Sequence, residues 1–135
     1  MICLDTNVVI AAINGRQPNV RMRLEEVMAD GEVPVIPTVV LFELHYGILK
    51  SARADRNATL LSTFLTLGFE SWSFEAEDAE EAGDIWATLE KAGTLIGPYD
   101  VLIAAQARLR DAVLVTANTS EFSRVPGLRL EDWSV

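Results

Sequence analysis

Short apolar segments alternate with longer segments of helical character, and this alternation constrains the fold more than any other feature. Strands are predicted at residues 2–4, 33–36, 69–74, 112–115 and 128–130. Helices with an apolar face are predicted between them, at residues 8–13, 17–30, 39–50 (with Thr38 as the cap), 54–67, 75–91 and 99–110. Strands that alternate with helices form parallel β-α-β units. We therefore expect an α/β protein with three layers, α/β/α, around a mostly parallel central sheet of about four to five strands.

The size and charge of the chain limit what it can be. A chain of 135 residues with 50% apolar content can bury a real core, and we expect a single domain over residues 1–133. The only cysteine, Cys3, lies in the first predicted strand and should be a buried thiol, so no intrachain disulfide is possible. No segment is typical of a signal peptide or a membrane span, which favours a cytoplasmic protein with no membrane partner.

The formal net charge of −9 argues against broad affinity for nucleic acid, because phosphate binding depends on basic surface. It does not exclude a nuclease, since acids that hold divalent metal ions carry part of this charge. A basic partner is a natural expectation for such a chain. Arg16, Arg21 and Arg23 form one basic cluster, either as a solvated helix face or as contacts to phosphate.

Four carboxylates stand where the predicted topology can bring them together. Asp5 directly follows the first strand, and Glu121 follows the strand at residues 112–115. Asp100 lies in the first turn of the last long helix, and Glu43 is surrounded by apolar residues in an earlier one. In open α/β sheets, ligands bind at the carboxyl ends of the strands. We therefore expect all four acids to approach one crevice at that edge.

Each acid also has a simpler explanation. Asp5 could only cap a helix, and Asp100 could only complement a helix dipole. Glu43 could belong to a narrow polar stripe with Lys50 on the surface. The polar run at residues 116–122 could be ordinary loop chemistry.

If the four acids do cluster, their chemistry is restricted. Two carboxylates about 4 Å apart repel by roughly 4 kcal/mol at an effective dielectric constant near 20, so the cluster would take up protons or bind cations. The acids have no cysteine or histidine among them, and their hard oxygen ligands favour Mg²⁺ or Mn²⁺. Such ions activate water and stabilise both oxygens of a phosphoryl displacement.

Four motifs in this chain resemble those of the PIN-domain ribonucleases, most closely the VapC-type toxins of bacterial toxin–antitoxin pairs. They are Leu-Asp-Thr-Asn at 4–7, Leu-Phe-Glu-Leu at 41–44, Ile-Gly-Pro-Tyr-Asp-Val-Leu-Ile-Ala-Ala at 96–105 and Thr-Ala-Asn-Thr-Ser-Glu-Phe at 116–122. The resemblance covers residues 1 to about 133, in the family's order and spacing. The first and third motifs together are fairly specific.

The resemblance implies a divalent-metal-dependent endoribonuclease that inhibits translation by cutting RNA. It implies that Asp5, Glu43 and Asp100 bind Mg²⁺ or Mn²⁺ and that Glu121 assists a second metal or the attacking water. The family usually has aspartate at this last position, which puts the second metal in question. Polar residues matching family positions that orient the acids or the scissile phosphate are Thr6, Asn7, Thr116 and Asn118.

The resemblance also implies partners. A cognate antitoxin would bind operator DNA through its own domain, so that the toxin reaches DNA only through it. The antitoxin would insert a segment, often with an arginine, into the acidic pocket and neutralise it by charge pairing. A homodimer is implied as well.

The residues alone do not exclude two other functions. One is a phosphatase or phosphotransferase with Asp5 as nucleophile, which is disfavoured because Asn7 stands where a second acid is needed and no lysine follows a later strand. The other is a catalytically weak binding scaffold or corepressor that acts with a DNA-binding partner.

Overall fold

The computed structural model describes residues 1–135. Its strands are β1 (Ile2–Leu4), β2 (Val113–Val115) and β3 (Arg129–Glu131). Its helices are α1 (Thr6–Asn14), α2 (Pro18–Ala29), α3 (Thr38–Leu49), α4 (Ala54–Leu65), α5 (Ala76–Ala92), α6 (Pro98–Leu109) and α7 (Thr119–Phe122). No helix is long and apolar enough to span a bilayer.

The sheet is parallel throughout. The regular strands lie in the order β1-β2-β3, with Cys3 opposite Leu114 and Leu114 opposite Leu130. Two parallel bridges extend it on the other side of β1, from Cys3 to Val35 and from Val35 to Glu70. Five segments therefore lie side by side, which confirms the expected α/β class with a mostly parallel sheet.

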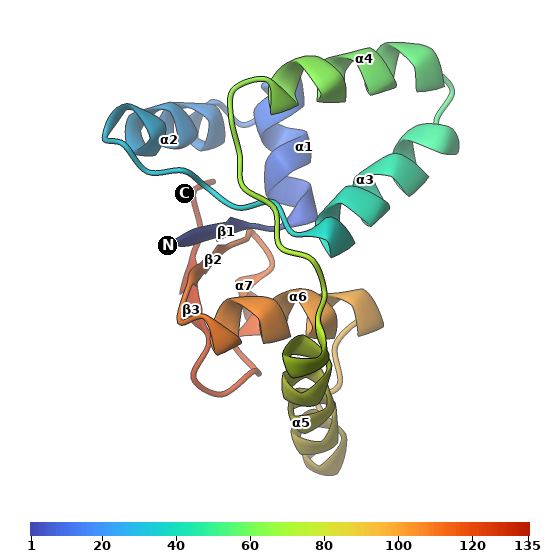
Figure 1. Cartoon of the computed structure of the whole chain (residues 1–135), viewed down its shortest axis with the longest axis vertical. Helices are drawn as coiled ribbons and strands as arrows, with labels where there is room; N and C mark the ends of the chain where they lie inside the picture. Colours follow the sequence, from blue (N-terminus) through green and yellow to red (C-terminus); the bar gives the residue numbers. More distant parts are fainter.

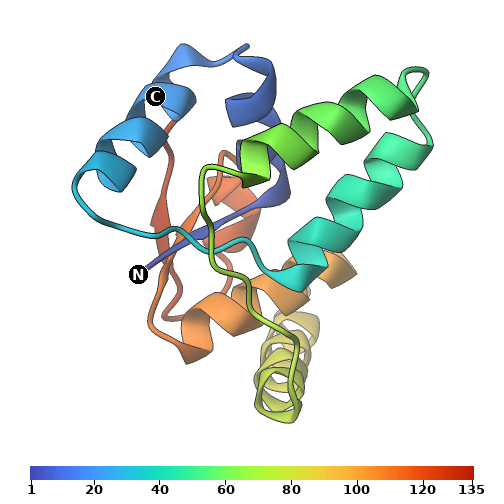
Figure 2. The ribbon, with the colours of Figure 1, turned by 45° about the horizontal axis from the view of Figure 1, so that its top comes forward.

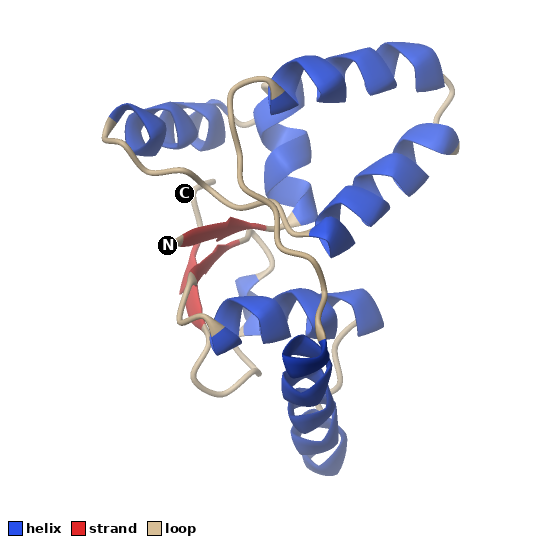
Figure 3. Cartoon of the chain, viewed as in Figure 1, coloured by secondary structure: helices blue, strands red, loops and turns tan.

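Helices cover both faces of this sheet, as Figures 1 and 3 show. Helices α1 to α4 lie on one side and α5 and α6 on the other, and the turned view in Figure 2 shows the same two layers. Successive segments run outward from β1 through Val35 to Glu70, and the chain then returns to the other side of β1 to form β2. The strand order thus reverses between β1 and β2, and such a switch point is where open α/β sheets bind ligands.

The second and third predicted strands are shorter than expected. Each forms only one bridge residue, Val35 and Glu70, within an extended segment. Pro34 and Pro37 flank the first of these bridges and have no N–H to donate to a ladder, which limits regular pairing there. The backbone still follows the sheet, because Val35 donates to the carbonyl of Ile2 at 2.8 Å.

One local prediction was wrong, and one alternative that the sequence left open is now decided. Thr38 does not cap α3 but is its first residue, and its hydroxyl donates to the Trp72 carbonyl at 3.0 Å instead. The run after β2 is not all loop, since residues 119–122 form the short helix α7. Phe122 is fully buried in the core, and burial of such a ring contributes about 2 kcal/mol, enough to fix this turn of helix against the sheet.

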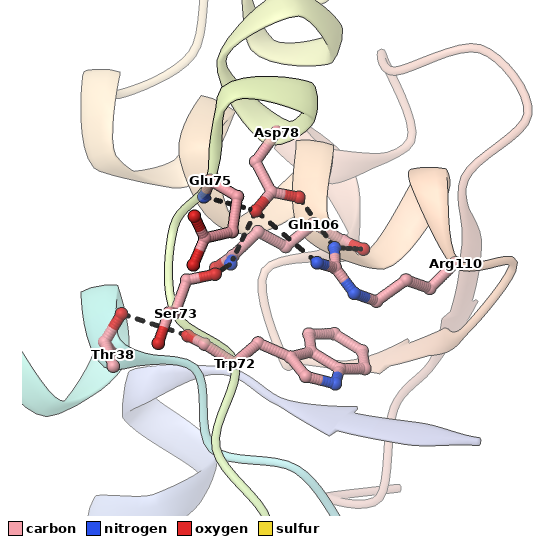
Figure 4. Close-up of polar contacts among 7 residues, drawn as sticks. All are labelled: Thr38, Trp72, Ser73, Glu75, Asp78, Gln106 and Arg110. Carbon is pink, nitrogen blue, oxygen red and sulfur yellow. Dashed lines mark hydrogen bonds and ion pairs between the residues drawn. The ribbon is translucent and has the colours of Figure 1, made fainter.

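A buried polar cluster ties α5 to α6 (Figure 4). The Asp78 side chain has no exposed surface and accepts a hydrogen bond of 2.7 Å from Arg110. It also accepts from the Glu75 backbone N–H at 2.8 Å, at the start of α5, and from the Gln106 amide at 3.4 Å. The Arg110 guanidinium lies 4.7 Å from the centre of the Trp72 ring. Helix α6 is therefore held at its end farthest from Asp100.

Candidate active site

Asp5 lies where β1 ends and α1 begins, and the residue is only 4% exposed. One carboxylate oxygen caps α1 by accepting from the Thr6 N–H at 2.8 Å. The Thr6 hydroxyl donates in turn to Glu43 of α3 at 2.7 Å. The capping role is thus real, and the same junction links Asp5 with Glu43. Glu43 is partly buried and accepts a hydrogen bond from Thr6. It therefore does not belong to an exposed polar stripe with Lys50.

The end of β2 approaches Asp5 from the neighbouring strand. The buried Thr116 hydroxyl donates to the second Asp5 oxygen at 2.9 Å and accepts from the Asn118 N–H at 3.0 Å. The Asn118 amide donates to Glu121 at 2.9 Å. Asp5, Thr116, Asn118 and Glu121 therefore form one continuous chain of contacts across the switch point. Asn7 does not join this network and lies exposed beside it.

Asp100 lies in the first turn of α6. Burial raises its pKa to about 6, and the negative charges of Asp5, Glu43 and Glu121 act in the same direction. The four predicted acids thus share one electrostatic environment. The charges that raise the pKa of Asp100 are all negative, so this carboxyl has no cationic partner to offset them.

Burial and the charge of Glu43 also raise the pKa of Asp5, although the hydrogen bonds from Thr116 and Thr6 oppose the shift. Burial and the nearby Asp5 charge raise the pKa of the Cys3 thiol, which is completely buried in β1 as expected. An inert thiol here leaves the carboxylates as the reactive groups of the site.

The donor set suits a hard divalent cation, although no three of these acids converge closely enough to form a cage by themselves. Mg²⁺ does not need such a cage, because it keeps several waters and is commonly held by one or two carboxylates together with substrate phosphate. The uncompensated negative charge on Asp100 is the feature of the structure that fits a cation.

Gly97 is a site residue that the sequence did not single out. A Cβ atom at this position would lie 3.2 Å from an Asp100 carboxylate oxygen, closer than side chains normally approach. In the sequence, glycine followed by proline indicates a turn at a helix start. It does not indicate that the missing side chain leaves space for the Asp100 carboxylate.

Two clefts border the site. One, of about 550 Å³, lies between α1, α3 and α4 and is lined by Glu43 together with Arg16 and Arg56. The second, of about 340 Å³, is lined by Asn7 and Ala117 and again by Arg16. The early basic cluster is divided, since Arg21 and Arg23 pair with acids on α2 whereas Arg16 pairs with none.

Comparison with known protein families matches residues 2–128 to the PIN domain. The chain belongs to the PIN-domain family. It is 40% identical over 131 residues to the tRNA(fMet)-specific endonuclease VapC of Shigella flexneri, covering 97% of this chain and 96% of that one. It is 38% identical over 130 residues to ribonuclease VapC2 of Rickettsia felis, covering 96% of each.

Solved structures of VapBC complexes have the same fold. The VapBC2 structure from Rickettsia felis, bound to a promoter DNA fragment, matches with a TM-score of 0.90 and 38% identity over 98% of this chain and 99% of that chain. DNA-bound VapBC from Salmonella typhimurium matches with a TM-score of 0.88 and 36% identity over 98% and 97%. These relatives confirm the expectation of a PIN-domain ribonuclease on the toxin side of a toxin–antitoxin pair.

Proposed function

We propose that this PIN-domain ribonuclease cuts transfer RNA in a reaction that depends on Mg²⁺ or Mn²⁺, with Asp5, Glu43, Asp100 and Glu121 as the acids of the site. The observation that carries the proposal is the position of these acids at the switch point, where burial and the charges of the other three raise the pKa of Asp100. Transfer RNA is the proposed substrate because relatives that are 40% and 37% identical are named as tRNA(fMet)-specific endonucleases.

The position of each site residue suggests its role in the reaction. Asp5 and Asp100, close enough for the charge of one to raise the pKa of the other, would hold the cation, with Glu43 completing the ligands through its link to Thr6. A bound divalent ion would supply Lewis-acid polarisation of the phosphodiester and a more acidic water. Thr116 fixes the orientation of Asp5, and Asn118 fixes that of Glu121. Glu121 is then placed to accept a proton from the attacking water, with Asn7 left exposed for the RNA.

We further propose a cytoplasmic protein that pairs with an antitoxin and forms a homodimer. The matching VapBC structures from Rickettsia felis and Salmonella typhimurium are both bound to DNA, so operator DNA would be reached through the antitoxin. A cationic antitoxin segment would complement the unneutralised carboxylates. Helix α3 exposes an apolar stripe that favours self-association, formed by Phe42, Tyr46 and Leu49.

The test is cleavage of a transfer RNA pool by the purified protein with Mg²⁺, Mn²⁺ or a chelator. Asp5→Asn and Asp100→Asn are each expected to reduce cleavage at least about 100-fold, since each removes charge where the reaction needs it. Asp30→Asn is the matched control, because Asp30 is an exposed acid at the end of α2.

The outcomes separate the candidate functions. Metal-dependent cleavage that both site variants lose, and the control keeps, supports the proposal. Cleavage that survives in the chelator or in both variants contradicts it. A folded protein that binds Mn²⁺ but cuts no RNA would favour the binding scaffold, and an acyl phosphate on Asp5 trapped with hydroxylamine would favour the phosphotransferase.

A further inference from the structure

Only some of the positively charged side chains of this acidic protein form ion pairs with carboxylates. Of its 11 lysine and arginine side chains, five form ion pairs with carboxylates, namely Arg21, Arg23, Arg108, Arg110 and Arg129. The side chains without a carboxylate partner are Arg16, Lys50, Arg53, Arg56, Lys91 and Arg124. These free cations are the groups that can still bind an external anion.

Two of the free cations line the cleft between α1, α3 and α4, which also contains Glu43 of the candidate active site. Arg16 and Arg56 are both exposed there. Arg16 lies on the second cleft as well, next to Asn7 and Ala117, which adjoin the polar residues around Asp5 and Glu121. Arg16 therefore lines both clefts, one of which contains Glu43 while the other reaches the neighbours of Thr6 and Thr116.

The remaining lining of the larger cleft is mixed. Asn14 and Asn57 offer polar groups, and its floor includes Ile13, Leu44 and Leu61. A track of guanidinium groups above an apolar floor suits a single-stranded RNA segment, whose phosphates pair with arginine while bases and riboses contact apolar surface.

An acidic protein needs local positive charge to hold RNA near its carboxylates. The carboxylate cluster and a net charge of −9 both repel RNA, so the phosphates on either side of the cut bond need local positive charge. We propose that Arg16 and Arg56 bind the backbone phosphates of the RNA strand that leads into the carboxylate site. This inference rests on the proposed ribonuclease function and adds the residues that hold the substrate.

The test measures RNA binding separately from cleavage. A fluorescently labelled initiator tRNA transcript is titrated with Asp100→Asn protein in EDTA over a series of KCl concentrations. For single strands, the slope of log K against log[salt] falls in magnitude by about 0.7 for each phosphate that the protein no longer neutralises. The double variant Arg16→Gln/Arg56→Gln should therefore lower the magnitude of the slope by about 1.4 and weaken binding at low salt.

Lys91→Gln is the matched control. It removes one of the same class of free cation, but from α5, which Figure 1 shows on the opposite side of the sheet from α1 and α4. Its salt slope and affinity should equal those of the parent protein. Circular dichroism and the thermal midpoint confirm that each variant is folded.

A second measurement uses the protein with an intact site. Arg16→Gln/Arg56→Gln should raise KM about tenfold or more while kcat stays within about twofold, because the substitutions weaken substrate and transition state equally. A lower kcat at unchanged KM would overturn the inference, since the arginines would then act on the reaction itself.

An unchanged salt slope in the double variant would also overturn the inference, even if the parent protein cuts RNA and the proposed function stands. Loss of binding to a labelled poly-glutamate peptide, with RNA binding unchanged, would assign the two arginines to an acidic protein partner instead. Absence of metal-dependent cleavage by the parent protein would count against the proposed function itself.

Discussion

Asp100 carries a charge that the folded protein does not favour in the absence of metal. Its pKa lies near 6 in the folded state, above the ordinary aspartate value of 3.8, because of burial and three neighbouring carboxylates. Between these two values the folded protein binds more protons than the unfolded chain. The contribution of Asp100 to stability is therefore most favourable below about pH 4 and is lost as the pH rises to about 6.

Asp100→Asn should accordingly stabilise the metal-free protein at pH 7.5. Because this carboxyl is partly exposed, solvent screening limits the gain to about 1 kcal/mol, or about 4 °C in the thermal midpoint. Thermal unfolding followed by circular dichroism in EDTA measures it. Mg²⁺ should then raise the midpoint of the parent protein more than that of the variant. A variant less stable than the parent at pH 7.5 would contradict the cost assigned to this carboxylate.

Gly97 leaves the room that Asp100 occupies. The backbone at Gly97 has φ −58°, which any residue adopts, so Gly97→Ala should fold normally. Its methyl group would press on the Asp100 carboxylate at 3.2 Å and displace it by a few tenths of an ångström. We expect kcat to fall about tenfold with a thermal midpoint that changes little. Gly83→Ala is the matched control, since a Cβ there meets nothing within 4 Å.

At the scale of elements, the pairing of α5 with α6 depends on the buried Asp78 and on Arg110. Burial alone would raise the pKa of Asp78, but hydrogen bonds from Arg110 and the Glu75 backbone outweigh it and hold the pKa below its ordinary value. Such a group stabilises the fold above the unfolded pKa of about 3.8, and that contribution is lost as the pH falls through and below this value.

Asp78→Asn should therefore lower the free energy of unfolding by about 3 kcal/mol at pH 7, because it leaves Arg110 without its carboxylate. Urea unfolding at pH 7 and pH 3 checks this, and the difference from the parent should shrink at pH 3. Asp84→Asn is the control, since Asp84 pairs with Arg108 but is 67% exposed and should contribute less than about 1 kcal/mol. Equal losses in the two variants would refute the role given to burial.

Helices and strands were predicted best where neighbouring residues alone determine where they begin and end. The position of Asp5 after an apolar strand, and that of Asp100 in a helix that begins with proline, can be read from neighbouring residues alone. The helical turn at residues 119–122 was missed because its threonine, serine and glutamate are common in loops, while the burial of Phe122 that stabilises it depends on the assembled core. The pairing of Asp78 with Arg110 has no local sequence signal, because the two residues are 32 positions apart.

At the scale of the whole molecule, the proposed homodimer can be tested through α3. Leu49 is 79% exposed and Tyr46 is 57% exposed, on the stripe away from the cleft that contains Glu43. Leu49→Arg should shift the mass measured by light scattering from dimer to monomer, because a buried unpaired charge is costly at an apolar interface. Met22→Arg on α2, 57% exposed, should leave the mass unchanged. A parent protein that is already monomeric would contradict the proposal.

The bond between Thr116 and Asp5 joins residues that are 111 positions apart. During synthesis at about 10 residues per second, Asp5 is added to the chain roughly ten seconds before Thr116. Until β2 takes its place beside β1, Asp5 lacks its main orienting contact, and Glu121 is absent altogether. A growing chain therefore cannot assemble this carboxylate cluster before Glu121 has been added, and until then the ribosome that translates it is not exposed to a finished nuclease.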